Sequence, residues 1–337
     1  MEIKLKFPLR ELTTLKVGGD ARYFCLADNL NDLKEAFAFA KHEKVPILIL
    51  GGGSNLLIDD KGFDGLVIKI NFLGLDFCEV GDSAEVIAGA GENWDSFVAT
   101  TVEHQLSGLE NLSGIPGTVG ATPVQNVGAY GVEVKDLINW VEAVNLETGE
   151  VKKFSNRECH FGYRDSFFKT LAGKKFVIVR VSYLLGRKFQ PRISYTDLAS
   201  YFADQRPVSA DEVRVAVLKI RAGKFPDLSK IGTAGSFFKN PIVHHSVASR
   251  LKSRYPELPT FSHQGEHVKV SLAWILDKIC LLRGFRHKST GLFEKQPLVL
   301  VNYGEATAEE IKNFSQMVKN KVQDATGIEI EEEVQIV

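Results

Sequence analysis

The sequence predicts a mixed fold of helices and strands, of the α+β or α/β class, in a chain long enough for two or three domains. Amphipathic helical stretches and short apolar runs alternate along the 337 residues without an internal repeat. The composition, 44% hydrophobic and 25% charged, is typical of a globular protein with a sizeable core.

The first third of the chain contains two predicted helices among several strands. Residues 29–44 place apolar side chains on one helical face, and the apolar run 45–50 predicts a short strand. Residues 56–70 predict a strand, a turn and a second strand, and residues 85–89 predict another strand. Asn93 is a predicted N-cap for the next helix.

The middle of the chain is rich in strand signals. Residues 140–146 and 150–154 flank a Thr-Gly pair and predict a hairpin. Residues 175–185 give the strongest strand signal of the sequence. Residues 209–221 predict a helix that opens with a Ser–Glu capping box.

The composition shifts at Gly223, and the last third again mixes both element types. Residues 271–283 predict a mostly buried helix, and residues 296–302 predict a strand. Residues 307–324 predict a helix capped by a Thr–Glu box. Residues 327–337 alternate apolar and acidic side chains, which predicts a terminal strand.

Charge and hydropathy exclude several partner classes. The formal net charge is −1 and no long block of like charge occurs, so we expect no nucleic-acid partner. The N-terminus lacks the apolar segment of a signal peptide, and no run of eighteen apolar residues occurs. We therefore expect a cytoplasmic protein without membrane contact.

Cysteine and histidine spacing indicates neither a disulfide framework nor a metal site. Without a C-x-x-C pair, the cysteines are predicted to be small buried side chains; they are Cys25, Cys78, Cys159 and Cys280. His263 and His267 have the i, i+4 spacing of a helical metal pair, but Gly265 and Pro259 disfavour a helix there.

Residues 113–131, SGIPGTVGATPVQNVGAYG, hold five glycines and two prolines among apolar side chains. Such a segment cannot form a long helix or a regular strand. It indicates a buried loop, and from the residues alone a loop against a ligand and a tight core turn are equally good interpretations. A second glycine cluster, GGGSN at 51–55, is followed by Leu56 and a strand, so it is not a Rossmann fingerprint. Its backbone N–H groups can still form an anion-binding turn.

Three further motifs carry side chains suited to chemistry. GYRDS at 162–166 offers an arginine for bidentate carboxylate recognition, or simply a surface turn with a local Arg–Asp pair. AGSFFKNP at 234–241 contains a serine that can donate a proton but lacks a nucleophile elbow. In the acidic run 331–333, strand alternation places Glu331 and Glu333 on one face, where solvated charges are the plainer interpretation.

Together, these five motifs, in this order and spacing, resemble the UDP-N-acetylenolpyruvoylglucosamine reductase family over nearly the whole chain. The resemblance implies an α+β protein, with a two-lobed FAD-binding domain of the vanillyl-alcohol-oxidase type and a separate α+β substrate-binding domain. It implies a first lobe at 1–72 rejoined by 328–337, a second lobe at 73–223, and a substrate domain at 224–327. The tyrosine-bearing region near Tyr195 is similar to the longer, type I form.

The resemblance implies FAD and NADPH as cofactors, UDP-N-acetylglucosamine enolpyruvate as substrate, and a monomer. NADPH would reduce FAD and leave, and the flavin N5 would then deliver hydride to the terminal enolpyruvyl carbon. The residues implied to contact FAD lie in the two glycine segments: Gly51, Gly52, Gly53, Ser54, Asn55, Ser113, Gly114, Ile115, Pro116, Gly117, Gly120, Ala121, Asn126, Gly128, Ala129, Tyr130 and Gly131.

By the same resemblance, Arg164 matches the arginine that polarises the substrate carboxylate, and Ser236 matches the proton donor. Glu333 matches the glutamate that stabilises the enolic intermediate, although Glu332 stands where the family commonly has proline, which leaves Glu331 as an alternative. The matching substrate contacts are Tyr163, Tyr195, Lys224, Asn240 and Gln296.

Two other functions compete with this one. Another flavin dehydrogenase or oxidase would keep the glycine segments but has no reason to keep Arg164, Ser236 and the terminal glutamate together. A non-catalytic flavin or nucleotide-sugar binding protein would bind these ligands without turnover.

Overall fold

The computed structural model describes all 337 residues, which divide into two compact units. Unit 1 comprises Met1–Phe7, Ala21–Gly53 and Asp64–Arg221, and unit 2 comprises Pro8–Asp20, Ser54–Phe63 and Ala222–Val337. Two short N-terminal pieces therefore belong to the same unit as the C-terminal third. Helices and strands interleave in sequence, as the α+β class predicts, and that class is confirmed.

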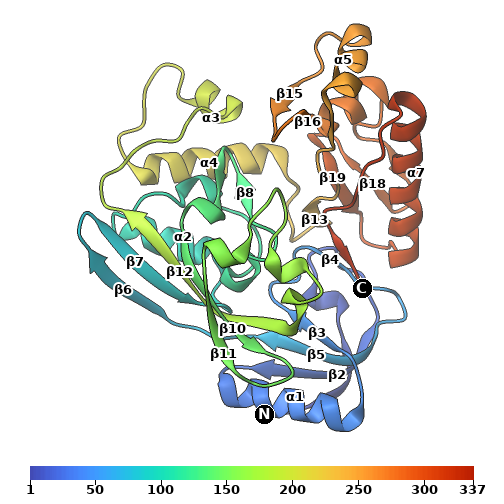
Figure 1. Cartoon of the computed structure of the whole chain (residues 1–337). Helices are drawn as coiled ribbons and strands as arrows, with labels where there is room; N and C mark the ends of the chain where they lie inside the picture. Colours follow the sequence, from blue (N-terminus) through green and yellow to red (C-terminus); the bar gives the residue numbers. More distant parts are fainter. The chain divides into compact units, whose positions relative to one another are not determined.

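Unit 1 contains two sheets and a short hairpin (Figure 1). The strands of the first sheet are β1 (Lys4–Pro8), β2 (Asp20–Ala27), β3 (Ile47–Leu50) and β5 (Phe63–Ile70). Those of the second are β6 (Leu75–Val80), β7 (Ser83–Gly89), β10 (Ile138–Asn145), β11 (Val151–Ser155) and β12 (Phe176–Gly186). The hairpin joins β8 (Gly128–Ala129) to β9 (Val132–Glu133).

The two sheets differ in strand direction. The first has the order β1-β2-β5-β3, and β3 runs parallel to β5. The second has the order β11-β10-β12-β7-β6, and every neighbouring pair is antiparallel. The helices are α1 (Leu30–Glu43), α2 (Trp94–Glu103), α3 (Thr196–Tyr201) and α4 (Ala210–Lys224), the last ending in residues of unit 2.

One core of unit 1 joins both sheets to α1 and α2. Leu33 of α1 and Ile68 of β5 are fully buried in it. Trp94 and Phe97 of α2 pack their rings 6.0 and 5.2 Å from the ring of Tyr183 on β12. This packing holds the start of α2 firmly beside the glycine-rich residues described below.

Unit 2 contains three small groups of strands. One sheet, of order β13-β19-β18-β17, comprises β13 (Gly232–Ser236), β17 (Arg286–His287), β18 (Thr290–Phe293) and β19 (Gln296–Asn302). Another, of order β14-β16-β15, comprises β14 (Ile242–His244), β15 (Thr260–Ser262) and β16 (His267–Val270). The third is a parallel pair of β4 (Leu56–Leu57) and β20 (Gln335–Ile336).

Three helices complete unit 2: α5 (His245–Arg254), α6 (Leu272–Trp274) and α7 (Ala308–Thr326), and α7 contacts β18 (Figure 1). Ile311, Phe314 and Val318 of α7 are buried in the core of this unit. The piece Ser54–Phe63 is held on α7, because the Asp60 carboxylate accepts from the backbone N–H of Ala308 at 2.8 Å. No helix of the protein combines the length and apolar character needed to cross a membrane.

Most predicted elements are confirmed, including their caps. The Asn93 side chain accepts from the Ser96 N–H, and the capping box of Thr307 and Glu310 is reciprocal. The box predicted at residues 209–212 is half formed: the Ser209 hydroxyl accepts from Glu212 N–H, but the Glu212 carboxylate accepts from Val208.

Three predictions are corrected. The helix expected over 271–283 ends earlier: α6 continues as a π-helical turn to Ile279, and Leu281 has φ +52°, which no right-handed helix accommodates. The terminal strand is interrupted, with one isolated bridge at Glu332 before the two residues of β20. Cys78 is exposed rather than buried, because it lies on the edge strand β6.

Candidate active site

The two glycine segments meet within unit 1. A Cβ atom on Gly52 would lie 2.7 Å from the Cα of Gly117, and one on Gly51 would lie 2.8 Å from the Thr118 hydroxyl oxygen. Gly117 itself has φ +138°, which disfavours any side chain there. Only glycine allows this approach, so the two predicted cofactor segments come together through their backbones. Ser54 and Asn55, at the end of the first segment, belong to unit 2.

Residues 114–118 form a partly exposed backbone run between the buried Ser113 and Val119. The Asp95 carboxylate fixes this run by accepting from the Gly114 N–H at 2.6 Å. Arg214 holds the same carboxylate in a bidentate pair at 2.6 and 3.0 Å. Burial raises the pKa of Asp95, but the hydrogen bonds from Arg214 and Gly114 outweigh it and leave the pKa below its ordinary value.

Arg221 is a second cation on this run. Its Nε donates to the Gly114 carbonyl oxygen at 3.0 Å, and burial lowers its pKa. Gly114 is therefore held from both sides, through its N–H by Asp95 and through its carbonyl by Arg221. This double hold fixes the peptide orientation of a segment that has no regular secondary structure.

The other half of the central segment is tied to the Arg164 turn. Gly162 and Asp165 pair as a tight turn, with Tyr163 and Arg164 at its tip. The Arg164 Nη2 donates to the Gly128 carbonyl oxygen at 2.8 Å, which orients the guanidinium. The buried Asn126 donates to the Gly162 carbonyl oxygen at 2.8 Å. Asn126 and Gly128, predicted to contact FAD, therefore lie beside the turn that carries Tyr163 and Arg164, predicted to contact the substrate.

Tyr195 lies beside Tyr130, with ring centroids 5.5 Å apart in an edge-to-face arrangement. Asn111 fastens the same two segments, because its Nδ2 donates to the carbonyl oxygens of Tyr130 at 2.9 Å and Arg192 at 2.7 Å. The buried Asn111 therefore sets the position of the chain that leads into Tyr195.

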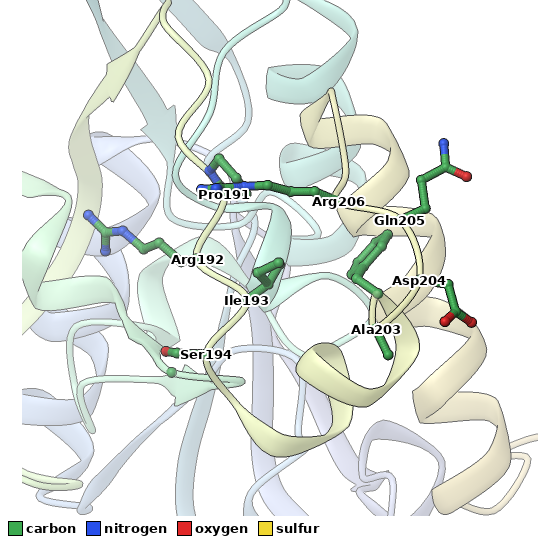
Figure 2. Close-up of a pocket in the computed structure, with 10 residues that line it drawn as sticks. Pro191, Arg192, Ile193, Ser194, Ala203, Asp204, Gln205 and Arg206 are labelled. Atoms are coloured by element: carbon green, nitrogen blue, oxygen red, sulfur yellow. The ribbon is translucent and has the colours of Figure 1, made fainter.

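A cavity of about 650 Å³ opens beside this segment (Figure 2). Figure 2 shows the side chains of Arg192 and Arg206 extending from the two stretches of chain that border it. Of the predicted site residues, Gly131 lines the cavity, whereas the three predicted catalytic residues do not.

In unit 2, the segment that carries Ser236 lies between two others. On one side Ser236 pairs with Val299 of β19, and the Phe237 N–H donates to the Leu298 carbonyl oxygen at 2.8 Å. On the other side the Glu333 N–H donates to the Phe237 carbonyl oxygen at 2.8 Å. Ser236 and Glu333, predicted to share the later chemistry, are therefore on hydrogen-bonded neighbouring segments.

The three terminal glutamates have different surroundings. Glu332 accepts from Ser315 at 3.0 Å and from Lys319 at 3.0 Å, both on α7; burial raises its pKa, but these bonds leave the pKa lowered. Glu331 is exposed and pairs with Lys239 at 3.0 Å. Glu333 is only partly exposed. Glu332 is therefore committed to the α7 contact, and Glu331 to a surface ion pair.

The predicted substrate contacts of unit 2 have separate positions. The Asn240 Oδ1 accepts from the Leu272 N–H at 2.9 Å, so this side chain also supports α6. Gln296 is the first residue of β19, and Lys224 is the last residue of α4. Arg164, Tyr163 and Tyr195 belong to unit 1.

Sequence patterns missed the residues that hold the glycine segment. Asp95, Arg214, Arg221 and Asn111 carry no motif, and Asp95 is 119 positions from Arg214. Lys69 was also missed; its Nζ donates to the Gly51 carbonyl oxygen at 3.3 Å, and burial lowers its pKa. For Asp95 and Lys69, a charged residue in a largely apolar element is the one signal that marks the position for inspection.

Comparison with known proteins agrees with this organisation. Residues 21–155 match the family model of an FAD binding domain. Residues 227–337 match that of the UDP-N-acetylenolpyruvoylglucosamine reductase C-terminal domain.

Full-length relatives carry the same family name. The UDP-N-acetylenolpyruvoylglucosamine reductase of Chromobacterium violaceum is 41% identical, over 99% of this chain and 98% of that protein. The enzyme of that name from Flavobacterium johnsoniae is 40% identical over the whole of both chains. The crystal structure of the Thermus caldophilus reductase superposes with a TM-score of 0.69 at 25% identity, covering 99% and 98% of the two chains. This chain belongs to the UDP-N-acetylenolpyruvoylglucosamine reductase family.

Proposed function

We propose that the protein is an FAD-containing, NADPH-dependent oxidoreductase. It reduces UDP-N-acetylglucosamine enolpyruvate to UDP-N-acetylmuramate, a cytoplasmic step of peptidoglycan precursor synthesis. The observation that carries this proposal is the match to one reductase family along the whole chain, at 41% identity to one relative. The reductase C-terminal domain match over residues 227–337 supports the choice of substrate over that of other flavin enzymes.

The paired glycine segments fit FAD. The partly exposed run 114–118 presents backbone groups whose orientation Asp95 and Arg221 fix, and Gly52 leaves no side chain beside Gly117. Such turns bind diphosphates through backbone N–H groups. When bound, FAD supplies the hydride transfer that links NADPH oxidation to reduction of the enolpyruvyl double bond.

Arg164 is proposed to bind the substrate carboxylate. One of its N–H groups donates to the Gly128 carbonyl oxygen, which holds the planar guanidinium in a fixed direction, and a guanidinium is well shaped for a carboxylate. A preorganised cation of this kind stabilises the negative charge that develops on the substrate carboxylate as hydride arrives. Tyr163 lies next to it at the tip of the same turn.

Ser236 and Glu333 are proposed to act at the other carbon. Ser236 donates its hydroxyl proton to the ether-bearing carbon, and Glu333 stabilises the enolic form that precedes this transfer. Their segments are hydrogen-bonded neighbours, so one rigid piece of unit 2 carries both groups. Tyr195, Lys224, Asn240 and Gln296 are proposed to bind the sugar nucleotide, with residues 224–327 as the substrate domain.

Anaerobic stopped-flow absorbance tests this function. The flavin band of the FAD-loaded protein is followed while NADPH is added first and the enolpyruvyl sugar nucleotide second. We expect bleaching by NADPH and recovery that depends on the substrate. Bleaching without recovery would instead indicate a flavin enzyme with another acceptor, and a protein that takes up no FAD would contradict the assignment.

A further inference from the structure

Asn55 makes an unusually long-range contact. Its side-chain Nδ2 donates to the main-chain carbonyl oxygen of Glu333 at 3.1 Å, across 278 positions of sequence. The main-chain carbonyl oxygen of Asn55 accepts from the Gln335 N–H at 3.0 Å. Asn55 therefore holds the chain on both sides of Val334. We call these two hydrogen bonds the Asn55 clasp.

The clasp continues into the parallel pair of β4 and β20. Gln335 pairs with Leu56 and Ile336 with Leu57. Beyond them, the Val337 N–H donates to the Leu57 carbonyl oxygen at 2.9 Å. The register of the terminal residues is therefore set against the residues that directly follow the first glycine segment.

The main chain of Glu333 is consequently held by hydrogen bonds at two atoms. Its N–H donates to the Phe237 carbonyl oxygen at 2.8 Å, on the segment of Ser236. Its carbonyl oxygen accepts from Asn55. With both groups of one residue fixed, the peptide planes on either side cannot rotate, and the direction of its Cα–Cβ bond is set.

We propose that Asn55 is the positioning residue for the Glu333 carboxylate. The inference rests on the proposed function, in which Glu333 acts after the flavin has been reduced. Asn55 is also the last residue of GGGSN, so one residue of the predicted cofactor segment holds the main chain of the predicted catalytic glutamate. An amide is required, because the clasp needs a side-chain donor of this length.

The role predicts a selective kinetic defect. A carboxylate displaced by about 1 Å loses much of its effect, and such misplacements cost up to about a hundredfold in rate. Substrate-dependent reoxidation of the flavin should therefore slow by about ten- to a hundredfold when the clasp is broken. Reduction of the flavin by NADPH does not use Glu333 and should change less than about twofold when the clasp is broken at Gln335, which is not a predicted cofactor contact.

Gln335→Pro and Gln335→Ala form a matched pair for this test. Proline removes the N–H that binds Asn55, whereas alanine keeps it and changes only an exposed side chain. Both half-reactions are measured anaerobically in the FAD-loaded proteins. We expect slow reoxidation in Gln335→Pro with normal reduction, and wild-type rates for both steps in Gln335→Ala.

The variant Asn55→Asp tests the same positioning role without placing a proline in strand β20. The aspartate has the same shape but cannot donate to the Glu333 carbonyl oxygen. Hydrogen exchange of the peptide containing residues 328–337 reports the clasp without any substrate, and it should become faster in both clasp variants.

The outcomes separate the two proposals. If wild-type flavin is not reoxidised by the sugar nucleotide, the proposed function is wrong. If wild-type turnover is normal and exchange is faster in the variants, but reoxidation is unchanged, the positioning role is wrong. A parallel loss of FAD affinity and of both half-reactions would also overturn it, because it would make Asn55 a cofactor ligand only.

Discussion

The central glycine segment of unit 1 and the terminal strand of unit 2 both carry predicted site residues, but they are held in different ways. In the glycine segment, Gly117 has φ +138° and lies so close to Gly52 of the first glycine segment that a Cβ atom on Gly52 would collide with it. In the terminal strand, main-chain hydrogen bonds fix the backbone and leave three adjacent carboxylates in three surroundings. Substitutions in the first region should therefore damage structure, whereas those in the second should impair the chemistry and leave the structure intact.

The largest expected effect is on turnover in the terminal strand. Glu333→Gln should lower kcat by about 10²–10³, the usual range for loss of one preorganised electrostatic group. Glu331→Gln should leave kcat within about twofold, because that exposed carboxylate pairs with Lys239 at the surface. Steady-state NADPH oxidation measures both variants. A large loss in Glu331→Gln with none in Glu333→Gln would reassign the catalytic carboxylate to Glu331.

The next effect is on stability in the glycine segment. Gly52→Ala should destabilise the protein by about 1–3 kcal/mol, because its Cβ would lie 2.7 Å from backbone that cannot move aside. Gly223→Ala is the matched control: it lies in α4, and apart from the helix's own nearby backbone no atom would lie within 4 Å of its Cβ. That control should be neutral or stabilising by up to about 1 kcal/mol. Urea unfolding of both variants measures the difference, and equal losses would show that close approach is not what requires glycine.

A smaller effect on stability is expected when the Asp95 carboxylate, which accepts from the Gly114 N–H, is replaced. Asp95→Asn keeps the shape but removes the charge that faces Arg214, at a cost of about 1 kcal/mol at pH 7. The folded pKa of Asp95 is lowered, so its contribution is present above the unfolded pKa and lost as the pH falls through the folded value. The difference in free energy of unfolding between variant and wild type should therefore disappear below pH 3.8. A difference that stays constant from pH 7 into this acid range would exclude the ion pair as its cause.

The smallest effect concerns Glu110, which precedes the segment and is almost fully buried. Burial raises the pKa of Glu110, so its contribution to stability is present below its unfolded pKa and lost as the pH rises through the folded pKa. Glu110→Gln should accordingly raise Tm by about 1–2 °C at pH 8 and change little at pH 4. Thermal melts at the two pH values measure this, and a stabilisation confined to pH 4 would have the wrong sign.

Local signals in the sequence predicted the elements well. Asn93 and Thr307 cap helices because their side chains accept from backbone N–H groups three residues further on, and that information is wholly local. The hairpin around residues 148–149 and the long strand β12 follow from alternation and turn residues. The predicted helix over 271–283 was wrong beyond Ile279 because a π-helical turn carries no such local signature.

The candidate site was predicted as motifs but not as an arrangement. The sequence around Asp95 does not predict its contact with Arg214, and the sequence around Asn55 does not predict its contact with Glu333. Both contacts join residues that are far apart in the sequence and meet only in the folded chain. Alternation did place Glu332 on the face opposite its neighbours, and the structure gives the reason in its bonds to α7. The roles of Arg164, Ser236 and Glu333 stay predictions that kinetics must test.

The most direct test of the proposed chemistry is Ser236→Ala, on the segment hydrogen-bonded to the terminal strand, with both half-reactions followed by anaerobic stopped-flow. We expect NADPH to bleach the flavin still at close to the wild-type rate. We expect reoxidation by the enolpyruvyl sugar nucleotide to slow by at least about a hundredfold, because the proton donor is gone. Equal losses in the two steps, or unimpaired reoxidation, would contradict the proton-donor role of Ser236.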